Sequence, residues 1–349
     1  MSGKKEVVLD PQLVKALGEV KYPGFDLSIV EMELVQEARI EDGKAIVRLR
    51  PVTAPQEVRE QVENLIASAV SQVAGVKELE LDMPEPPKHK DKPEGPRPIE
   101  GVRWVVPVAS GKGGVGKSTV AVNLALGLAQ RGLKVGLLDL DLYGPSVPTL
   151  MGANNAQPTN VGDKLAPVVA HGIKILSIGF LMPKDKALIW RGPLIMKAVT
   201  QLFHEVAWAP LDVLVLDLPP GTGDVQITMA QEVPISGAVV VTTPQDVALV
   251  DAIKGVDMFK AVDAPVLGIV ENMSYFVCSN CGTRHEIFGH GSVEPLCRRL
   301  GVSYLGELPL ETRVRELSDQ GTPPVVGGGE AAQPYLDLAD KVQARLEEM

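Results

Sequence analysis

Short apolar runs, separated by helical patterns, organise most of the chain after residue 100. Several runs are rich in β-branched residues and predict buried strands, at residues 105–109, 135–138, 213–216, 238–241 and 266–270. Continuous apolar strands with intervening helices indicate a parallel sheet covered on both faces. Ligands of such sheets bind at the carboxyl ends of the strands.

A different pattern precedes residue 83. Residues 45–50 alternate in side-chain direction after the turn residues 41–44, which predicts a β-hairpin. An apolar stripe from Val58 to Val73 predicts a helix, and Val76 to Leu81 a further short strand. These elements form a small α+β unit.

Residues 83–101 are rich in proline and charge and nearly free of apolar side chains. A segment of this composition cannot bury a core and is typical of a semi-rigid linker. We therefore expect a small α+β domain over residues 1–82, a linker over 83–101 and a larger domain over 102–349. A last amphipathic helix, near residues 335–346, has an acidic polar face and is expected to pack on the larger domain.

Composition narrows the class of protein. The chain has 349 residues and a formal net charge of −10, which argues against a nucleic-acid or anionic-membrane partner. The first residues lead into no apolar segment, and no apolar run approaches membrane-spanning length. Three cysteines do not make a secreted disulfide framework. We expect a cytoplasmic protein.

The first strand of the larger domain leads into a glycine-rich segment that fits the pattern G-x-x-x-x-G-K-[ST]. The segment is Gly111-Lys112-Gly113-Gly114-Val115-Gly116-Lys117-Ser118-Thr119. Its backbone N–H groups can close around phosphate oxygens, Lys117 can reach the outer phosphates, and the Ser118 hydroxyl can ligate Mg²⁺. A chance match is disfavoured by the flanking strand and helix. The position of Lys112 suggests a nucleotide shared between two subunits.

The fold predicted from these features is α/β: a parallel-sheet P-loop NTPase domain preceded by a small α+β domain. Acidic residues follow two of its strands. Asp141 is the candidate for positioning the attacking water and Asp139 for the metal shell, although an aspartate pair in a helix-capping turn is the alternative. Asp217 is a candidate Mg²⁺ partner, and the loop from Asp217 to Asp224 a candidate sensor of the γ-phosphate, against a purely structural loop.

Cys278 and Cys281 form the only C-x-x-C of the chain, and Cys297 stands alone. Two thiolates are half of the four ligands that zinc or a cubane iron–sulfur cluster needs. Either His285 or His290 completes a zinc site, or two subunits contribute a pair each. A redox pair is a third option, without the usual placement at a helix start. The spacing alone does not choose between zinc and a bridging cluster.

Taken together, the motifs resemble the Mrp/ApbC branch of the MinD-like (deviant Walker A) ATPases over residues 100–345. The motifs that carry the resemblance are residues 112–119, 138–146, 190–193, 217–224 and 271–274 with the C-x-x-C. MinD-like and plasmid-partition ATPases share the lysine and aspartate motifs but lack the C-x-x-C. The small domain resembles the metal–sulfur cluster assembly domain often fused to these ATPases. Here residues 52–56 read Val-Thr-Ala-Pro-Gln where many members have a cysteine.

The resemblance implies a homodimeric iron–sulfur cluster carrier with ATP and Mg²⁺ as ligands. It implies a [4Fe–4S] cluster bridging two subunits through Cys278 and Cys281 of each. Lys112 reaches the nucleotide of the partner, while Asn272 and the backbone at Pro309 lie near the adenine. The carrier would receive its cluster from a donor scaffold and pass it to apo-proteins.

The leading hypothesis is therefore an ATPase, expected to be slow, in which Lys112, Lys117, Asp141 and Asp217 act on the nucleotide. Hydrolysis is expected to change the dimer through the loop from Asp217 to Asp224, lying between the nucleotide and the cysteine loop. The alternative is a MinD- or ParA-like ATPase switch with structural zinc at the C-x-x-C.

Overall fold

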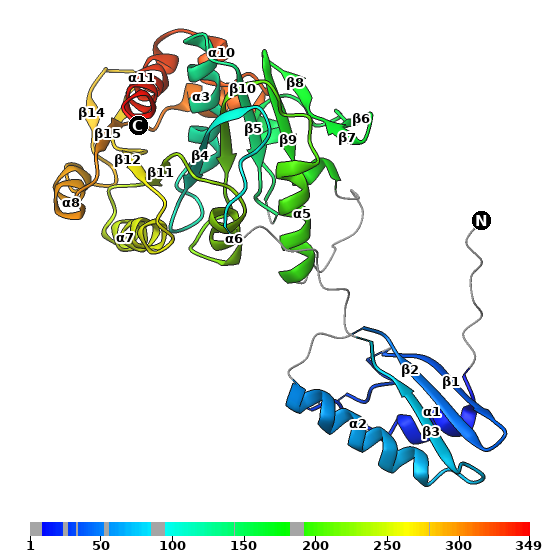
Figure 1. The fold of residues 1–349 in the computed structure, drawn as a ribbon. Helices are drawn as coiled ribbons and strands as arrows, with labels where there is room; N and C mark the ends of the chain where they lie inside the picture. The colour runs from blue at the N-terminus through cyan, green and yellow to red at the C-terminus, as the bar shows by residue number, and fades with distance from the viewer. Residues whose placement is uncertain are drawn as a thin grey trace. The chain divides into compact units, whose positions relative to one another are not determined.

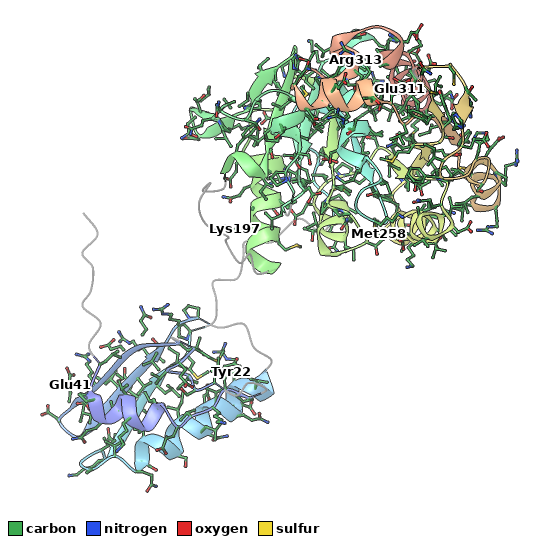
Figure 2. All side chains as sticks on the ribbon, turned by 180° about the vertical axis from the view of Figure 1, so that it is seen from behind. Tyr22, Glu41, Lys197, Met258, Glu311 and Arg313 are labelled. Carbon is green, nitrogen blue, oxygen red and sulfur yellow. The ribbon has the colours of Figure 1, made fainter. Side chains whose placement is uncertain are left out.

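The computed structural model describes residues 9–23, 27–32, 34–51, 56–84, 95–142, 144–181, 192–278 and 280–349. The chain divides into two compact units, Met1–Glu94 and Gly95–Met349. Each unit has its own hydrophobic core, and Figure 2 draws the side chains that fill them. Several segments named above lie outside the described residues. They are residues 52–55, where the chain lacks the cysteine of many family members, most of the linker, Tyr143, and the motif residues Trp190 and Arg191.

In its described residues, the first unit is a three-stranded sheet with two helices. Its elements are α1 (Pro11–Leu17), β1 (Val35–Glu41), β2 (Lys44–Leu49), α2 (Gln56–Ser71) and β3 (Glu78–Asp82). The predicted hairpin is present, because β1 and β2 pair antiparallel with Glu41 opposite Lys44, and β3 joins β2 in parallel. The helix α1 was not predicted from the sequence. Its N-terminus is capped by Asp10, whose Oδ1 accepts from the Gln12 N–H at 2.8 Å.

The second unit is built on one eight-stranded sheet, in the order β15-β12-β11-β4-β10-β5-β9-β8 (Figure 1). Its strands are β4 (Val102–Ala109), β5 (Val135–Asp139), β8 (Val168–Ala170), β9 (Ile173–Ser177), β10 (Leu211–Asp217), β11 (Ala238–Thr242), β12 (Val266–Glu271) and β15 (Tyr304–Glu307). Neighbouring strands run parallel except β8, which pairs antiparallel with β9 at one edge. The predicted parallel sheet is confirmed, and the antiparallel edge strand is an addition to it.

Helices cover both faces of the sheet. They are α3 (Lys117–Gln130), α4 (Val147–Leu150), α5 (Gly192–His204), α6 (Asp224–Glu232), α7 (Asp246–Ala261), α8 (Val293–Leu300), α9 (Thr312–Asp319), α10 (Pro324–Gly327) and α11 (Gln333–Glu347), with 3₁₀ turns η1 (Ile178–Leu181) and η2 (Glu330–Ala332). Buried residues of α3 and α11 share one core with one face of the strands, and those of α5 to α8 share the other. Along β4, Val106 and Val108 enter the first core while Val105 and Ala109 enter the second.

Two small two-stranded sheets lie outside the main sheet. They are formed by β6 (Thr159–Val161) with β7 (Lys164–Ala166), and by β13 (Phe276–Val277) with β14 (Arg284–His285). The second unit also begins earlier than the expected start at residue 102. Ile99 is 4% exposed in its core, and the Arg97 N–H donates to the Glu232 carbonyl at 2.9 Å.

Candidate functional site

The glycine-rich segment connects β4 to α3 at the carboxyl edge of the sheet. Gly114 and Gly116 both have a φ of 82°, a left-handed conformation that favours glycine. Gly116 precedes the first helical residue, Lys117, so the segment turns directly into a helix N-terminus. A Cβ at Gly116 would also lie 2.2 Å from Asn272 Nδ2. Strand, tight turn and helix N-terminus together form an anion-binding arrangement.

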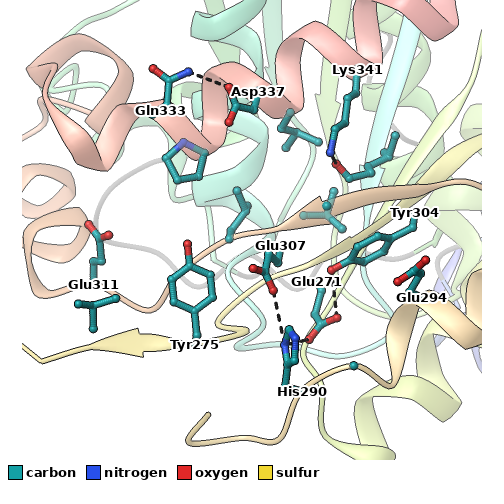
Figure 3. A pocket seen from close by; sticks show the side chains of 18 of the residues that line it. Glu271, Tyr275, His290, Glu294, Tyr304, Glu307, Glu311, Gln333, Asp337 and Lys341 are labelled. Carbon is teal, nitrogen blue, oxygen red and sulfur yellow. Dashed lines mark hydrogen bonds and ion pairs between the residues drawn. The ribbon is translucent and has the colours of Figure 1, made fainter. Parts of the chain in front are cut away.

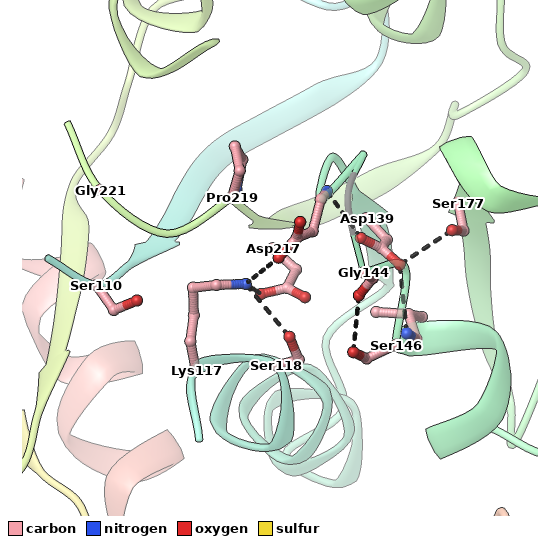
Figure 4. Close-up of polar contacts among 12 residues, drawn as sticks. Ser110, Lys117, Ser118, Asp139, Gly144, Ser146, Ser177, Asp217, Pro219 and Gly221 are labelled. Atoms are coloured by element: carbon pink, nitrogen blue, oxygen red, sulfur yellow. Dashed lines mark hydrogen bonds and ion pairs between the residues drawn. The ribbon is translucent and has the colours of Figure 1, made fainter. Parts of the chain in front are cut away.

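Lys117 lies among the acidic side chains of neighbouring strands (Figure 4). Its Nζ is 2.5 Å from Asp217 Oδ1, 3.7 Å from Asp141 Oδ2 and 3.2 Å from Ser118 Oγ. Lys117 is 6% exposed and Asp217 is fully buried. Burial raises the pKa of Asp217, and the neighbouring Lys117 and Ser118 oppose that rise. The structure therefore brings together four of the predicted strand-end and phosphate-loop residues.

Asp139 has a different environment from Asp141. Its Oδ1 accepts from the Asp141 N–H at 3.0 Å, and its Oδ2 from the Val147 N–H at 3.3 Å and the Ser177 hydroxyl at 2.9 Å. Val147 is the first residue of α4, whose N-cap residue is Ser146, so Asp139 accepts from the start of that helix without being its N-cap. Burial and the nearby Asp217 raise the pKa of Asp139 to about 7. Both carboxylate oxygens of Asp139 thus already have hydrogen-bond donors, an arrangement that favours a structural role over a place in the metal shell.

The loop after Asp217 is held from two sides. The Gly221 N–H donates to the Ser110 carbonyl at 2.8 Å, which ties the loop to the phosphate-binding segment. Gln226 on α6, 1% exposed, donates its Nε2 to the carbonyls of Pro219 at 2.8 Å and Gly221 at 2.9 Å. Sequence reasoning missed Gln226, because a single glutamine inside a helix gives no signal of such a role.

The remaining nucleotide candidates flank the phosphate loop. Asn272 is 5% exposed and donates its Nδ2 to the Val115 carbonyl at 2.7 Å. Lys112 Nζ lies 3.5 Å from Gln245 Oε1, which holds this second lysine near the start of α7. Pro309 lies in the segment that leaves β15, a strand adjacent to the one that ends beside Asn272.

Cys278 and Cys281 lie in the turn of the hairpin formed by β13 and β14, which we call the cysteine hairpin (residues 276–285). The Cys278 N–H donates to the Thr283 carbonyl at 2.9 Å, and the Gly282 N–H to the Cys278 carbonyl at 2.8 Å. Cys281 is exposed, its Sγ is 3.2 Å from Thr283 Oγ1, and hydrogen bonding to Thr283 lowers the pKa of its thiol.

Cys297, His285 and His290 are the third cysteine and the two histidines considered above as ligands. Cys297 is buried on α8, and burial raises the pKa of its thiol to about 11. His290 Nδ1 is hydrogen bonded to Ser274 Oγ at 3.1 Å, and the His285 ring lies near Phe276. The described residues contain no group of three or more His, Cys, Asp or Glu side chains placed to hold one metal ion.

Strand order corrects one expectation. The loop after Asp217 follows β10 and the cysteine hairpin follows β12, and these strands lie on opposite sides of β4. Within one chain, the phosphate loop therefore lies between the loop from Asp217 to Asp224 and the cysteine hairpin. The prediction that this loop lies between nucleotide and cysteines was wrong, because the order of strands in a sheet is not encoded in their apolar pattern.

Comparison with known proteins assigns the second unit. The family described as NUBPL iron-transfer P-loop NTPase matches residues 101–343. The chain belongs to this family. A second family, described as iron-sulfur cluster assembly protein, matches residues 11–81. The first match covers the unit built on the eight-stranded sheet, and the second match covers the small N-terminal unit.

Curated relatives of this chain bear consistent names. An iron-sulfur cluster carrier protein of Escherichia coli (strain K12) is 54% identical over 251 residues, covering 71% of this chain and 68% of the relative. Another protein of that name, from Deinococcus radiodurans, is 43% identical over 336 residues, covering 95% and 94%. The resemblance inferred from the motifs is confirmed.

Solved structures agree with the fold. A nucleotide-binding protein of Archaeoglobus fulgidus, solved in complex with ADP, is 40% identical, with a TM-score of 0.58 over 64% of this chain and 88% of that one. The cell division ATPase MinD of Pyrococcus furiosus has a TM-score of 0.53 at 22% identity, covering 69% and 98%, and shares the fold. Among the helices formed by described residues, none combines the length and apolar character needed to cross a membrane.

Proposed function

We propose that the protein is a Mg²⁺-dependent ATPase that carries an iron–sulfur cluster from a donor scaffold to apo-proteins. One observation carries the proposal: a phosphate-binding loop and a hairpin with two thiols, one of them exposed, lie at the same edge of one sheet, after β4 and β12. The names of the E. coli and D. radiodurans relatives and the ADP of the A. fulgidus structure support it.

The nucleotide half of the site has the groups that phosphoryl transfer needs. The N–H groups of residues 111–119 bind the phosphates, with Lys117 on the outer ones. Asp217 Oδ2 is buried and has no hydrogen-bond partner among the described residues, and Ser118 adds a hydroxyl nearby. A carboxylate and a hydroxyl oxygen are ligands that suit Mg²⁺, which when bound neutralises charge on the phosphates. Asp141, 9% exposed beside Lys117, orients the attacking water.

The cargo half of the site is incomplete in one chain. Cys278 and Cys281 supply two thiolates, whereas a cubane cluster takes four. In this proposal a second copy of the chain supplies the other pair, so the cluster bridges a homodimer. The lowered pKa of Cys281 favours the thiolate that binds iron. Lys112 reaches the partner's nucleotide, and Asn272 and Pro309 border the base.

Anaerobic reconstitution with iron and sulfide, followed by metal analysis, tests the proposal. We expect the wild-type protein to take up iron and sulfide, and the Cys278→Ala/Cys281→Ala variant to lose both while binding nucleotide as before. Cys297→Ala is the matched control, since it removes a buried thiol outside the hairpin. Full iron uptake by the double variant contradicts the ligand assignment. Zinc alone, in stoichiometric amount, supports the alternative of a MinD- or ParA-like switch.

A further inference from the structure

The side chain of Arg284 links the cysteine hairpin to the sheet. Arg284, three residues after Cys281, donates Nη1 and Nη2 to the two carboxylate oxygens of Glu307, each at 3.2 Å. Its guanidinium carbon also lies 3.9 Å from the centre of the Tyr275 ring. Bidentate pairing and ring stacking both fix the plane of a guanidinium. Arg284 therefore determines how β14, and with it the thiol-bearing turn, lies against β15.

Glu307 belongs to a hydrogen-bonded cluster at the end of β12 and β15, beside a pocket of about 640 Å³ (Figure 3). Ser274 Oγ lies 2.8 Å from Glu271 Oε1, 3.1 Å from Glu307 Oε2 and 3.1 Å from His290 Nδ1. A serine hydroxyl has one proton to donate. It can satisfy Glu271 or Glu307 at one time, but not both. Ser274 and Glu271 are 0% and 1% exposed, whereas the side chains of Glu307 and His290 are 31% and 36% exposed, so water reaches one end of this cluster.

The other end of this cluster reaches the phosphate loop. Asn272 follows Glu271 directly, and its side chain holds the Val115 carbonyl inside the loop. Backbone hydrogen bonds add a parallel connection. The Leu308 N–H donates to the Glu271 carbonyl at 2.8 Å, and the Leu310 N–H to the Tyr275 carbonyl at 2.7 Å. These two bonds flank Pro309, where the proposed function places the nucleotide base.

A continuous path therefore leads from the phosphate loop to the thiols. We name it the serine relay, and its members are Asn272, Glu271, Ser274, Glu307 and Arg284. It contains one element with two discrete arrangements, in which the Ser274 hydroxyl donates its hydrogen bond either to Glu271 or to Glu307. Coupling between two sites needs such an element, one whose equilibrium both sites bias.

We propose that the serine relay couples nucleotide binding to the position of the cysteine hairpin, with Arg284 as the residue that positions the two thiols. A nucleotide that moves the Val115–Asn272 contact shifts the hydrogen bond of the Ser274 hydroxyl between the two carboxylates. No proton is transferred, but Glu307 gains or loses a hydrogen-bond donor, which changes how strongly it pairs with Arg284, and the hairpin moves. The proposal rests on the proposed function in that it takes residues 111–119 as the nucleotide site and the hairpin as the cluster site.

Thiol reactivity in the protein without cluster tests the relay. The rate at which iodoacetamide alkylates Cys281 is measured by peptide mass spectrometry, with and without saturating Mg-ADP. We expect the nucleotide to change the wild-type rate by about fivefold or more, the lower end of common allosteric couplings. In Arg284→Gln and in Ser274→Ala the two rates converge. Arg284→Lys keeps one ion pair with Glu307 and gives an intermediate ratio.

Arg315→Gln is the matched control, because it removes an exposed arginine from an i,i+4 pair on α9, away from the relay. Its nucleotide-dependent ratio stays at the wild-type value. ADP saturation is verified in each variant, so that weaker binding does not imitate lost coupling. The proposal is overturned if nucleotide leaves the wild-type rate unchanged, or if Arg284→Gln and Ser274→Ala both keep the wild-type ratio. Neither result bears on iron uptake, which tests the proposed function separately.

Discussion

Replacing Lys117 by methionine tests the buried ion pair beneath the phosphate loop. Lys117 Nζ lies 2.5 Å from Asp217 Oδ1, with side chains 6% and 0% exposed. Methionine fills a similar volume without the charge, so Asp217 keeps its burial but loses its cation. Removing one partner of a buried pair lowers the free energy of unfolding by about 3–5 kcal/mol. We expect a loss of that size at about pH 8.

The stability lost in Lys117→Met is larger at high pH than at low pH. Burial raises the pKa of Asp217 and Lys117 opposes that rise, so the pKa rises further in Lys117→Met. A carboxyl whose pKa is higher in the folded state stabilises the fold at low pH, and this contribution is lost as the pH rises through the folded-state pKa. The variant therefore approaches wild-type stability near about pH 5, because protonated Asp217 carries no unpaired charge.

Urea unfolding followed by tryptophan fluorescence measures this effect for the second unit alone, since Trp104, Trp190 and Trp208 all lie in it. Lys254→Met is the matched control: Lys254 is 63% exposed in its pair with Asp251, so its loss changes stability by less than about 1 kcal/mol. The reasoning is refuted if Lys117→Met costs no more than the control, or if its cost is the same at both pH values.

Three further substitutions test separate parts of the site. Gly116→Ala abolishes nucleotide binding, because its Cβ would lie 2.2 Å from the buried side-chain amide of Asn272. Gly132→Ala is the control: Gly132 also has a positive φ, of 87°, but open space surrounds it, so this variant keeps its nucleotide affinity. Thr283→Val slows alkylation of Cys281 near neutral pH, because valine cannot make the side-chain hydrogen bond by which Thr283 lowers the pKa of that thiol. Asp139→Asn lowers the free energy of unfolding most at low pH. The difference from wild type narrows as the pH rises from about 4 to about 7, because only the wild-type carboxyl takes up a proton on folding in that window.

Each of these has a result that contradicts it. Nucleotide titration calorimetry showing equal affinities for the two glycine variants removes the steric argument. An alkylation rate in Thr283→Val equal to wild type means that the threonine does not set thiol reactivity. For Asp139, a stability difference that stays constant across the window contradicts the raised pKa.

The sequence predicted those features that depend on neighbouring residues in the chain. Apolar runs of strand length identified β4, β5, β10, β11 and β12. The glycine-rich segment located the phosphate loop, since its turn and helix start follow each other directly. The hairpin before residue 50 followed from turn residues between alternating positions.

Features that depend on tertiary contacts were not predicted. An aspartate after a strand has the same local pattern whether it accepts from backbone N–H groups, as Asp139 does, or pairs with a lysine, as Asp217 does. The serine relay joins polar residues of β12, β15 and the cysteine hairpin, and isolated polar residues have no periodicity to detect. Strand order likewise decided which loop lies beside the hairpin.

Native mass spectrometry of the anaerobically reconstituted protein tests the central claim most directly, because it reports oligomeric state and bound metal in one spectrum. We predict that the cluster is found on dimers alone, with about two iron and two sulfide per chain, as four thiolates from two hairpins require. Clusters carried by single chains, or a metal retained by dimers of the Cys278→Ala/Cys281→Ala variant, would contradict the account.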